Sequence, residues 1–173
     1  VGTVFEEIER VSHSSVRQKI LSCIRVLATH HFDCTINELL ERGPDSGLST
    51  MGALQVLARD KALLLRLFNH FTDTLNNSDP GSTAQPNKLV LAATVALGHL
   101  FTVSDSSVGV VVRKYFPQLF GTFLLRIGTT PEGLHAQQAA AAFMNFLHAS
   151  QNDSMALALE GDRLSRADAE QSD

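Results

Sequence analysis

The chain lacks tryptophan, and its 173 residues include one tyrosine and two cysteines. No segment alternates polar and apolar residues over a sustained length, which is the pattern of a half-buried β-strand. Leucine and alanine are abundant instead, and ten phenylalanines provide bulky side chains for a core. We therefore expect an all-α fold, in one domain that is long enough to bury a substantial core.

The two cysteines, Cys23 and Cys34, form neither a CxxC motif nor a disulfide framework. Small secreted domains usually hold several cystine pairs, so this pattern favours a reducing compartment and we expect no disulfide. We predict a cytoplasmic protein. Cys23 is expected on the apolar face of its helix, where it behaves as a small hydrophobic residue.

Charge is scarce, since 18% of the residues are charged and the net charge is −4. Residues 1–150 hold 12 acidic and 12 basic side chains, whereas residues 151–173 hold 6 acidic and 2 basic ones. A neutral body lacks the basic stripe that nucleic acid requires, so we expect no nucleic-acid partner. Segments 89–104 and 133–152 are too short or too interrupted by polar residues for a membrane span, and no signal peptide is expected at the N-terminus.

Motifs for catalysis are also missing from the sequence. It contains no G-x-S-x-G nucleophile motif and no Gly-rich phosphate loop. The nearest approach to a metal cluster is His30-His31-x-x-Cys34, but three loosely spaced ligands fall short of a zinc site. We predict no catalytic, cofactor-binding or metal-binding residue, no cofactor and no enzymatic activity.

Histidines recur near the expected C-termini of three helices, at His30, His99 and His148. One interpretation is a row of histidines that lines one side of a helical array. The other, which we favour, is an interaction of each imidazole with the helix dipole and the last carbonyl groups.

Apolar residues recur at spacings of three and four along most of the chain, which is the pattern of amphipathic helices. Helices are expected at 3–11, after Ser15, after Thr35, at 50–57, 60–76 and 88–101, after Asp105, after Thr130 and at 154–159. Capping boxes at Ser15/Gln18 and Thr35/Glu38 mark two of the starts, and Thr130-Pro131 marks a third. Residues 43–50, with Gly43-Pro44, are expected to form a loop, and the polar stretch 76–87 is expected to be mobile.

Several helices have a predictable face. The helix after Ser15 is expected to bury Val16, Ile20, Cys23, Ile24 and Leu27.

Pro117 is expected to kink or split the helix that contains it. The run from Ala139 to Ala142 allows a neighbouring helix to come close. The phenylalanine-rich segments 64–75 and 115–123 are expected in the core, the alternative being a groove for a partner helix.

One kind of segment recurs. Residues 19–32 and 88–101 agree at Lys19/Lys88, Val26/Val95, His30/His99 and Phe32/Phe101, and residues 136–149 form a third segment of this kind. Recurrence of one helical unit predicts a stacked array in which each hairpin covers the apolar face of the next. We expect seven to nine helices.

The stretches Val16-Arg17-Gln18-Lys19-Ile20-Leu21 and Leu89-Val90-Leu91-Ala92-Ala93-Thr94-Val95-Ala96-Leu97-Gly98 resemble HEAT-like repeat proteins, and among them the maestro-type HEAT-like family. The resemblance covers about residues 4–160 and implies scaffolding or partner binding, with no catalytic residue to transfer.

Together, these observations predict an all-α fold of antiparallel helical hairpins, stacked as a HEAT/armadillo-like α-solenoid. Residues 1–161 are expected to form the helical repeat domain, and residues 162–173 a polar, disordered tail. The predicted function is non-catalytic protein–protein interaction or scaffolding, with other proteins as partners. The first alternative is a compact helical bundle that regulates or binds an apolar ligand, and the second is a cryptic enzyme.

Overall fold

The computed structural model describes residues 2–11, 13–42, 47–77, 88–103, 106–130, 133–152 and 154–159. These residues form helices and short connections without a strand, so the all-α prediction is confirmed. The nine labelled helices are α1 (Gly2–Arg10), α2 (Ser14–His30), α3 (Phe32–Glu41), α4 (Gly47–Ala58), α5 (Lys61–Asn76), α6 (Lys88–Phe101), α7 (Ser106–Lys114), α8 (Phe116–Thr129) and α9 (Leu134–Ala149). Residues 154–159 add one short helical segment.

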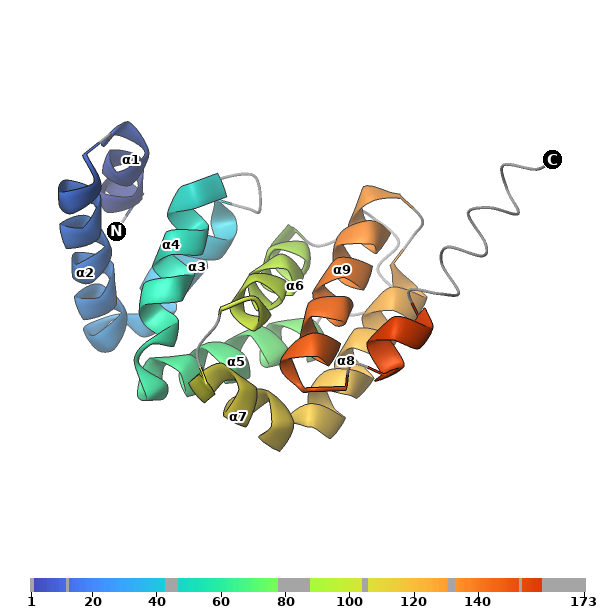
Figure 1. The fold of residues 1–173 in the computed structure, drawn as a ribbon. Helices are drawn as coiled ribbons and strands as arrows, with labels where there is room; N and C mark the ends of the chain where they lie inside the picture. The colour runs from blue at the N-terminus through green and yellow to red at the C-terminus, as the bar shows by residue number, and fades with distance from the viewer. Residues whose placement is uncertain are drawn as a thin grey trace.

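The helices lie in two rows. Helices α2, α4, α6 and α9 follow one another across the molecule, and each contacts the next (Figure 1). Helices α3, α5 and α8 lie behind them, and they are joined to the front row by the pairs α2–α3, α4–α5 and α8–α9. Most contacts therefore connect helices that are close in the sequence.

The most extensive contact departs from a simple succession of hairpins, because it joins α6 to α9. In the sequence, α7 and α8 lie between these two helices, and the chain breaks between them. Helix α7 ends at Lys114, Tyr115 forms a turn, and α8 begins at Phe116 with Pro117 in its first turn. Proline fits there because the first helical turn needs no backbone donor. The predicted split at Pro117 is confirmed. Helix α9 is the neighbour of α6 in the front row.

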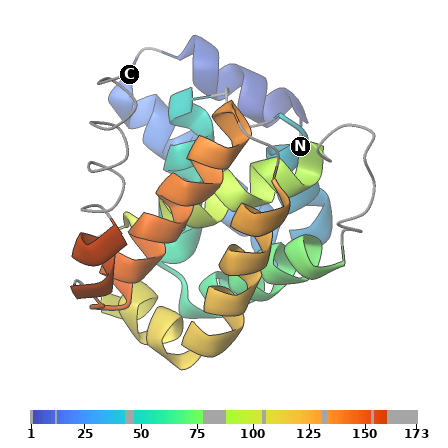
Figure 2. The same ribbon diagram turned by 90° about the vertical axis from the view of Figure 1, so that its right-hand side faces the viewer.

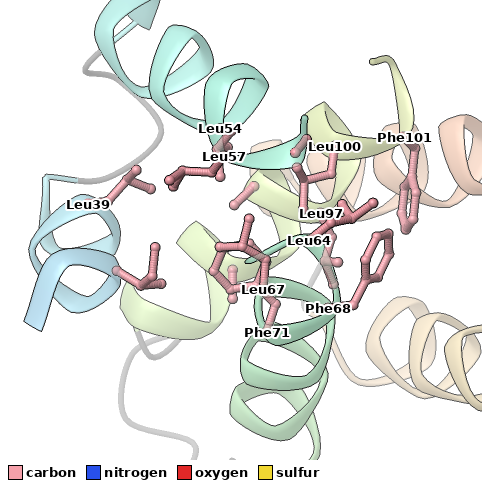
Figure 3. Close-up of a cluster of buried hydrophobic side chains, with 14 of the residues drawn as sticks. Leu39, Leu54, Leu57, Leu64, Leu67, Phe68, Phe71, Leu97, Leu100 and Phe101 are labelled. Carbon is pink, nitrogen blue, oxygen red and sulfur yellow. The ribbon is translucent and has the colours of Figure 1, made fainter. Parts of the chain in front are cut away.

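A single hydrophobic cluster runs through the molecule from Phe5 in α1 to Ala156 in the last helical segment. At its centre, side chains from α3, α4, α5 and α6 meet (Figure 3). Leu97 and Leu100 of α6 are fully buried there against Leu64 and Leu67 of α5. Helix α6 is buried nearly all round, as its lack of charge between residues 89 and 101 predicts.

The predicted helix starts are partly wrong. Helix α2 begins at Ser14, with His13 as N-cap, and no side chain caps it, so Ser15 is inside the helix. Helix α3 begins at Phe32, and Thr35 lies in its second turn, where its hydroxyl donates to the carbonyl of His31. Thr130 ends α8 instead of starting α9, since its backbone N–H and its hydroxyl both donate to the carbonyl of Arg126. A Ser or Thr hydroxyl can also donate to a carbonyl one turn earlier within a helix, so the residue type does not by itself mark a helix start.

The predicted loop at 43–50 is also shorter than expected, because α4 already begins at Gly47. Residues 43–46, 78–87, 104–105, 131–132 and 160–173 lie outside the described part of the chain. The predictions for Gly43-Pro44, for most of the 76–87 stretch, for Asp105 and for the tail therefore stay predictions.

The buried face of α2 differs from the predicted one. Leu21, Ile24 and Ala28 are buried, whereas Val16 and Cys23 are exposed and Ile20 and Leu27 are half-buried. The apolar stripe is therefore rotated partly away from the core, and the prediction that Cys23 packs inside is wrong.

Replacing Asp60 by alanine tests the start of α5. The Asp60 carboxylate accepts hydrogen bonds from the amides of Ala62 (2.9 Å) and Leu63 (3.2 Å). Loss of this N-cap is expected to lower the free energy of unfolding by about 1 kcal/mol in urea denaturation. Asp73→Ala, at an exposed position on the same helix, serves as the control and is expected to change it by less than about 0.5 kcal/mol. Equal losses for the two variants would show that Asp60 does not cap α5.

Candidate functional site

The segment His30-His31-x-x-Cys34 forms the corner between α2 and α3. His31 follows the last residue of α2 and directly precedes α3, and its backbone N–H donates to the carbonyl of Leu27. Its own carbonyl accepts from the backbone and the hydroxyl of Thr35. His30 and Cys34 are exposed, and Cys34 is a free thiol. The corner is thus shaped by backbone hydrogen bonds.

Helix α5 packs against this corner through an aromatic and cationic contact. The Arg66 guanidinium lies 4.1 Å from the centre of the Phe32 ring, and the His70 ring meets the same ring edge-on at 5.8 Å. His70 Nδ1 is also 4.0 Å from a carboxylate oxygen of Asp33. A cation over an aromatic face contributes about 0.5–1 kcal/mol at an exposed site, so this group joins α3 to α5. Neither Arg66 nor His70 was singled out from the sequence, because the partner ring lies more than thirty positions away.

The described residues contain no group of three or more histidine, cysteine or acidic side chains that is placed to hold a metal ion. Among the described helices, none is long and apolar enough to cross a bilayer.

His30, His99 and His148 lie in the last turns of α2, α6 and α9. These helices belong to the same row and run in the same direction in Figure 1, so the three histidines lie along one edge of that row. Helix α4 separates α2 from α6. The geometry thus agrees with both interpretations given above, since each histidine is at a helix C-terminus and all three share an edge.

Burial lowers the pKa of His99 below the usual 6.5. The folded chain therefore resists protonation of His99, while the unfolded chain accepts the proton as the pH falls below 6.5. The free energy of unfolding is expected to fall over this range. His99→Gln is expected to flatten the decline, as measured by urea denaturation at a series of pH values. Coincident pH profiles for the parent chain and the variant would contradict this account.

A polar contact joins α5 to α8 in the back row. Arg126 of α8 donates a hydrogen bond to the carbonyl of Leu75, in the last turn of α5. One turn earlier, the hydroxyl of Thr122 lies 3.0 Å from the Asn76 side-chain oxygen and 2.9 Å from the carbonyl of Gln118. Burial lowers the pKa of Arg126, but its usual value is so high that the side chain stays charged. The cation is therefore placed where the α5 dipole is negative.

The contact between α6 and α9 is unusually close at one point. A Cβ on Gly98 would lie 2.9 Å from the Cβ of Ala142. The side-chain amide of Asn145 donates to the carbonyl of Gly98 at 3.3 Å. The predicted close approach at the Ala139–Ala142 run is confirmed, and its partner is α6.

Phenylalanines of α5, α6, α8 and α9 form a continuous group in the core, and the predicted burial of segments 64–75 and 115–123 is confirmed at Phe68, Phe71 and Phe123. Phe68, Phe101, Phe123 and Phe146 are buried and touch in sequence from α5 through α6 and α8 to α9, with ring centres 5.6–5.8 Å apart. The described part of the protein is all-helical, and these ring contacts hold α5, α6, α8 and α9 together.

Comparison with known proteins supports this class. No protein-family model matches the chain, and no solved structure matches it. The chain is 30% identical over 138 residues to "Maestro heat-like repeat-containing protein family member 1" of Dictyostelium discoideum, an alignment that covers 73% of the chain and 8% of the relative. The chain is therefore a relative of the maestro heat-like repeat proteins, and the predicted resemblance is confirmed. It spans less than a tenth of that relative's length.

Proposed function

We propose that this chain is a non-catalytic protein–protein interaction or scaffolding module, built from HEAT-like helical repeats. The relation to a HEAT-like repeat protein is the observation that carries this proposal. Repeat arrays of this kind present extended surfaces to their partners, because each unit contacts mainly its neighbours.

The arrangement of helices supports an α-solenoid as the architecture. The front row α2–α4–α6–α9 and the pairs α2–α3, α4–α5 and α8–α9 are the contacts that stacked hairpins make. The core continues through all of these pairs as one cluster. We place the repeat domain at residues 1–161, followed by a polar tail, and we expect a cytoplasmic location, where Cys23 and Cys34 stay reduced.

Affinity capture with the 173-residue chain tests the function. We expect at least one protein to bind saturably and stoichiometrically when it is purified and titrated against the chain by isothermal calorimetry. The binding should be unchanged by the removal of divalent metals with a chelator. The proposal would be contradicted if no captured protein bound to the chain in the purified system. It would also be contradicted if the chain converted a captured small molecule into a product.

A further inference from the structure

Helix α1 lies outside the two rows of helices, beside α2 (Figure 1). Its main contacts are with α2 and α4. One side of the helix provides two anchors, Phe5 and Ile8, which are 0% and 1% exposed and belong to the core cluster. Val4 packs half-buried beside them, whereas Glu7 and Arg10 on the other side are exposed. Helix α1 is therefore bound as an amphipathic helix is, through apolar side chains three positions apart.

An arginine that directly follows α3 holds the first half of α1. The Arg42 guanidinium lies 5.4 Å from the centre of the Phe5 ring, and it is 3.8 Å from a carboxylate oxygen of Glu6. Arg42 is also 3.4 Å from the Glu38 carboxylate of its own helix, and its side chain is only 18% exposed. The position of this cation is thus set by α3. It favours an aromatic ring with a carboxylate next to it.

A second arginine holds the other end of α1. Arg17 of α2 donates a hydrogen bond of 2.9 Å to the carbonyl of Val11, whose own N–H donates to the carbonyl of Glu7 in the last turn of α1. The cation lies where the dipole of α1 is negative. None of these contacts depends on the covalent connection between α1 and α2. A separate helix with the same side chains makes them equally well.

Helix α1 is also short enough to leave while the other helices stay packed. It has nine residues, and isolated helices of this length are marginal in water, so its order depends on the two anchors and the two arginines. Helix α6, in contrast, is buried nearly all round. Segments with few buried apolar side chains open locally at a lower free energy than core helices do.

We propose that α1 is a detachable occupant of its site, and that a helix of a partner protein takes its place. The site, which we call the α1-binding surface, consists of the parts of α2 and α4 that α1 covers, together with Arg17 and Arg42. The partner helix is amphipathic, with an aromatic and an aliphatic residue three positions apart and a carboxylate beside the aromatic one. Bound α1 excludes it, because a tethered helix competes at an effective concentration of about millimolar. This inference rests on the proposed function, and it names the kind of partner.

Hydrogen exchange of the full chain, followed by mass spectrometry, tests whether α1 detaches. Amides of α1 are expected to exchange at least about tenfold faster than those of α5 and α6, because they open locally. Arg42→Gln is expected to raise the exchange rate in α1 by about two- to fivefold and to leave α5 and α6 unchanged. Arg66→Gln is the matched control, since Arg66 lies 4.1 Å from the centre of the Phe32 ring, and it is expected to leave α1 unchanged. If α1 exchanges only as slowly as α5 and α6, it opens only with the whole fold and the proposal is overturned.

Fluorescence anisotropy with a labelled peptide of residues 2–11 tests whether the surface accepts a separate helix. The peptide is added to the parent chain and to a Phe5→Ala/Ile8→Ala chain, whose own α1 lacks its anchors. This opened chain is expected to bind the peptide at least about tenfold more tightly than the parent chain does. A peptide with the same two substitutions is expected not to bind. Adding Arg42→Gln to the opened chain is expected to weaken binding by about two- to fivefold.

The control for general destabilisation is Phe116→Ala, which leaves α1 intact. Phe116 belongs to α8, at the end of the molecule that faces the viewer in Figure 2, away from α1. This variant is expected to bind the peptide as weakly as the parent chain does. Circular dichroism establishes that each variant folds. Equal binding to the parent and opened chains, or no binding to the folded opened chain, would overturn the proposal. So would a dimer of the opened chain that the peptide does not dissociate, since a second copy would then be the occupant.

Proteins captured by the parent chain separate this inference from the proposed function. At least one of them is expected to bind the opened chain at least about tenfold more tightly than the parent chain, because α1 no longer competes. Equal affinity of every captured protein for the two chains would place the partner elsewhere, which overturns this inference and leaves the proposed function standing. If no captured protein binds, the proposed function fails, and with it the partner named here.

Discussion

Replacing Phe146 by alanine is expected to lower the free energy of unfolding by about 3–5 kcal/mol. Phe146 is fully buried, and its ring lies 5.1–6.1 Å from the rings of Phe101, Phe116, Phe123 and Phe143. Removing it leaves a cavity at the point where α6, α8 and α9 meet, and surrounding rings fill such a space only partly. Because a domain of this size is stable by about 5–15 kcal/mol, this one change removes a large share of the total.

Urea denaturation followed by circular dichroism measures the effect. Phe116→Ala is the matched control, because Phe116 is half-buried and, within the described part of the chain, its ring contacts the rings of Phe120 and Phe146 alone. It is expected to cost clearly less than Phe146→Ala. Similar decreases in the free energy of unfolding for the two variants would mean that Phe146 is not the central residue of the aromatic group.

The Gly98→Ala substitution is expected to destabilise the chain by about 1–3 kcal/mol. The added Cβ would lie 2.9 Å from the Cβ and 3.1 Å from the Cα of Ala142, so α6 and α9 must separate. Separation also lengthens the 3.3 Å hydrogen bond from Asn145 to the Gly98 carbonyl. The loss is expected even though alanine is the better helix former by about 1 kcal/mol.

Gly121→Ala in α8 is the control for helix propensity. A Cβ at Gly121 has no atom within 4 Å, so this variant is expected to gain about 0.5–1 kcal/mol. The double variant Gly98→Ala/Ala142→Gly is expected to recover part of the loss by removing the opposing methyl group. If Gly98→Ala stabilises the chain as Gly121→Ala does, the two helices are not in close contact there.

Local signals in the sequence predict those parts of the fold that depend on neighbouring residues. The bounds of α6 match the predicted 88–101, because an apolar run between a lysine and a polar connection defines both ends. The predicted helices at 50–57 and 60–76 correspond to α4 and α5, and the structure shows that Asp60 caps α5. Pro117 separates α7 from α8 for the same kind of local reason.

Contacts between distant segments are not visible in the sequence. Nothing local to Gly98 indicates that Ala142 and Asn145 will pack against it, and nothing near Arg126 indicates that it will bond to the Leu75 carbonyl. The periodicity of α2 shows that one side is apolar but not how much of that side a neighbour covers, which is why Val16 and Cys23 were wrongly placed in the core. In the candidate site, the sequence predicted that histidines lie at helix ends. It did not predict that Arg66 and His70 contact the Phe32 ring, which only the fold shows.

Small-angle X-ray scattering tests most directly whether the helices stack in sequence order as an extended array. The scattering is extrapolated to zero protein concentration, so that association between copies does not contribute. We predict a radius of gyration larger than the roughly 16 Å of a compact domain of 173 residues, with a skewed pair-distance distribution. A symmetric distribution with a radius of gyration of about 16 Å or less would contradict the array and favour a compact helical bundle.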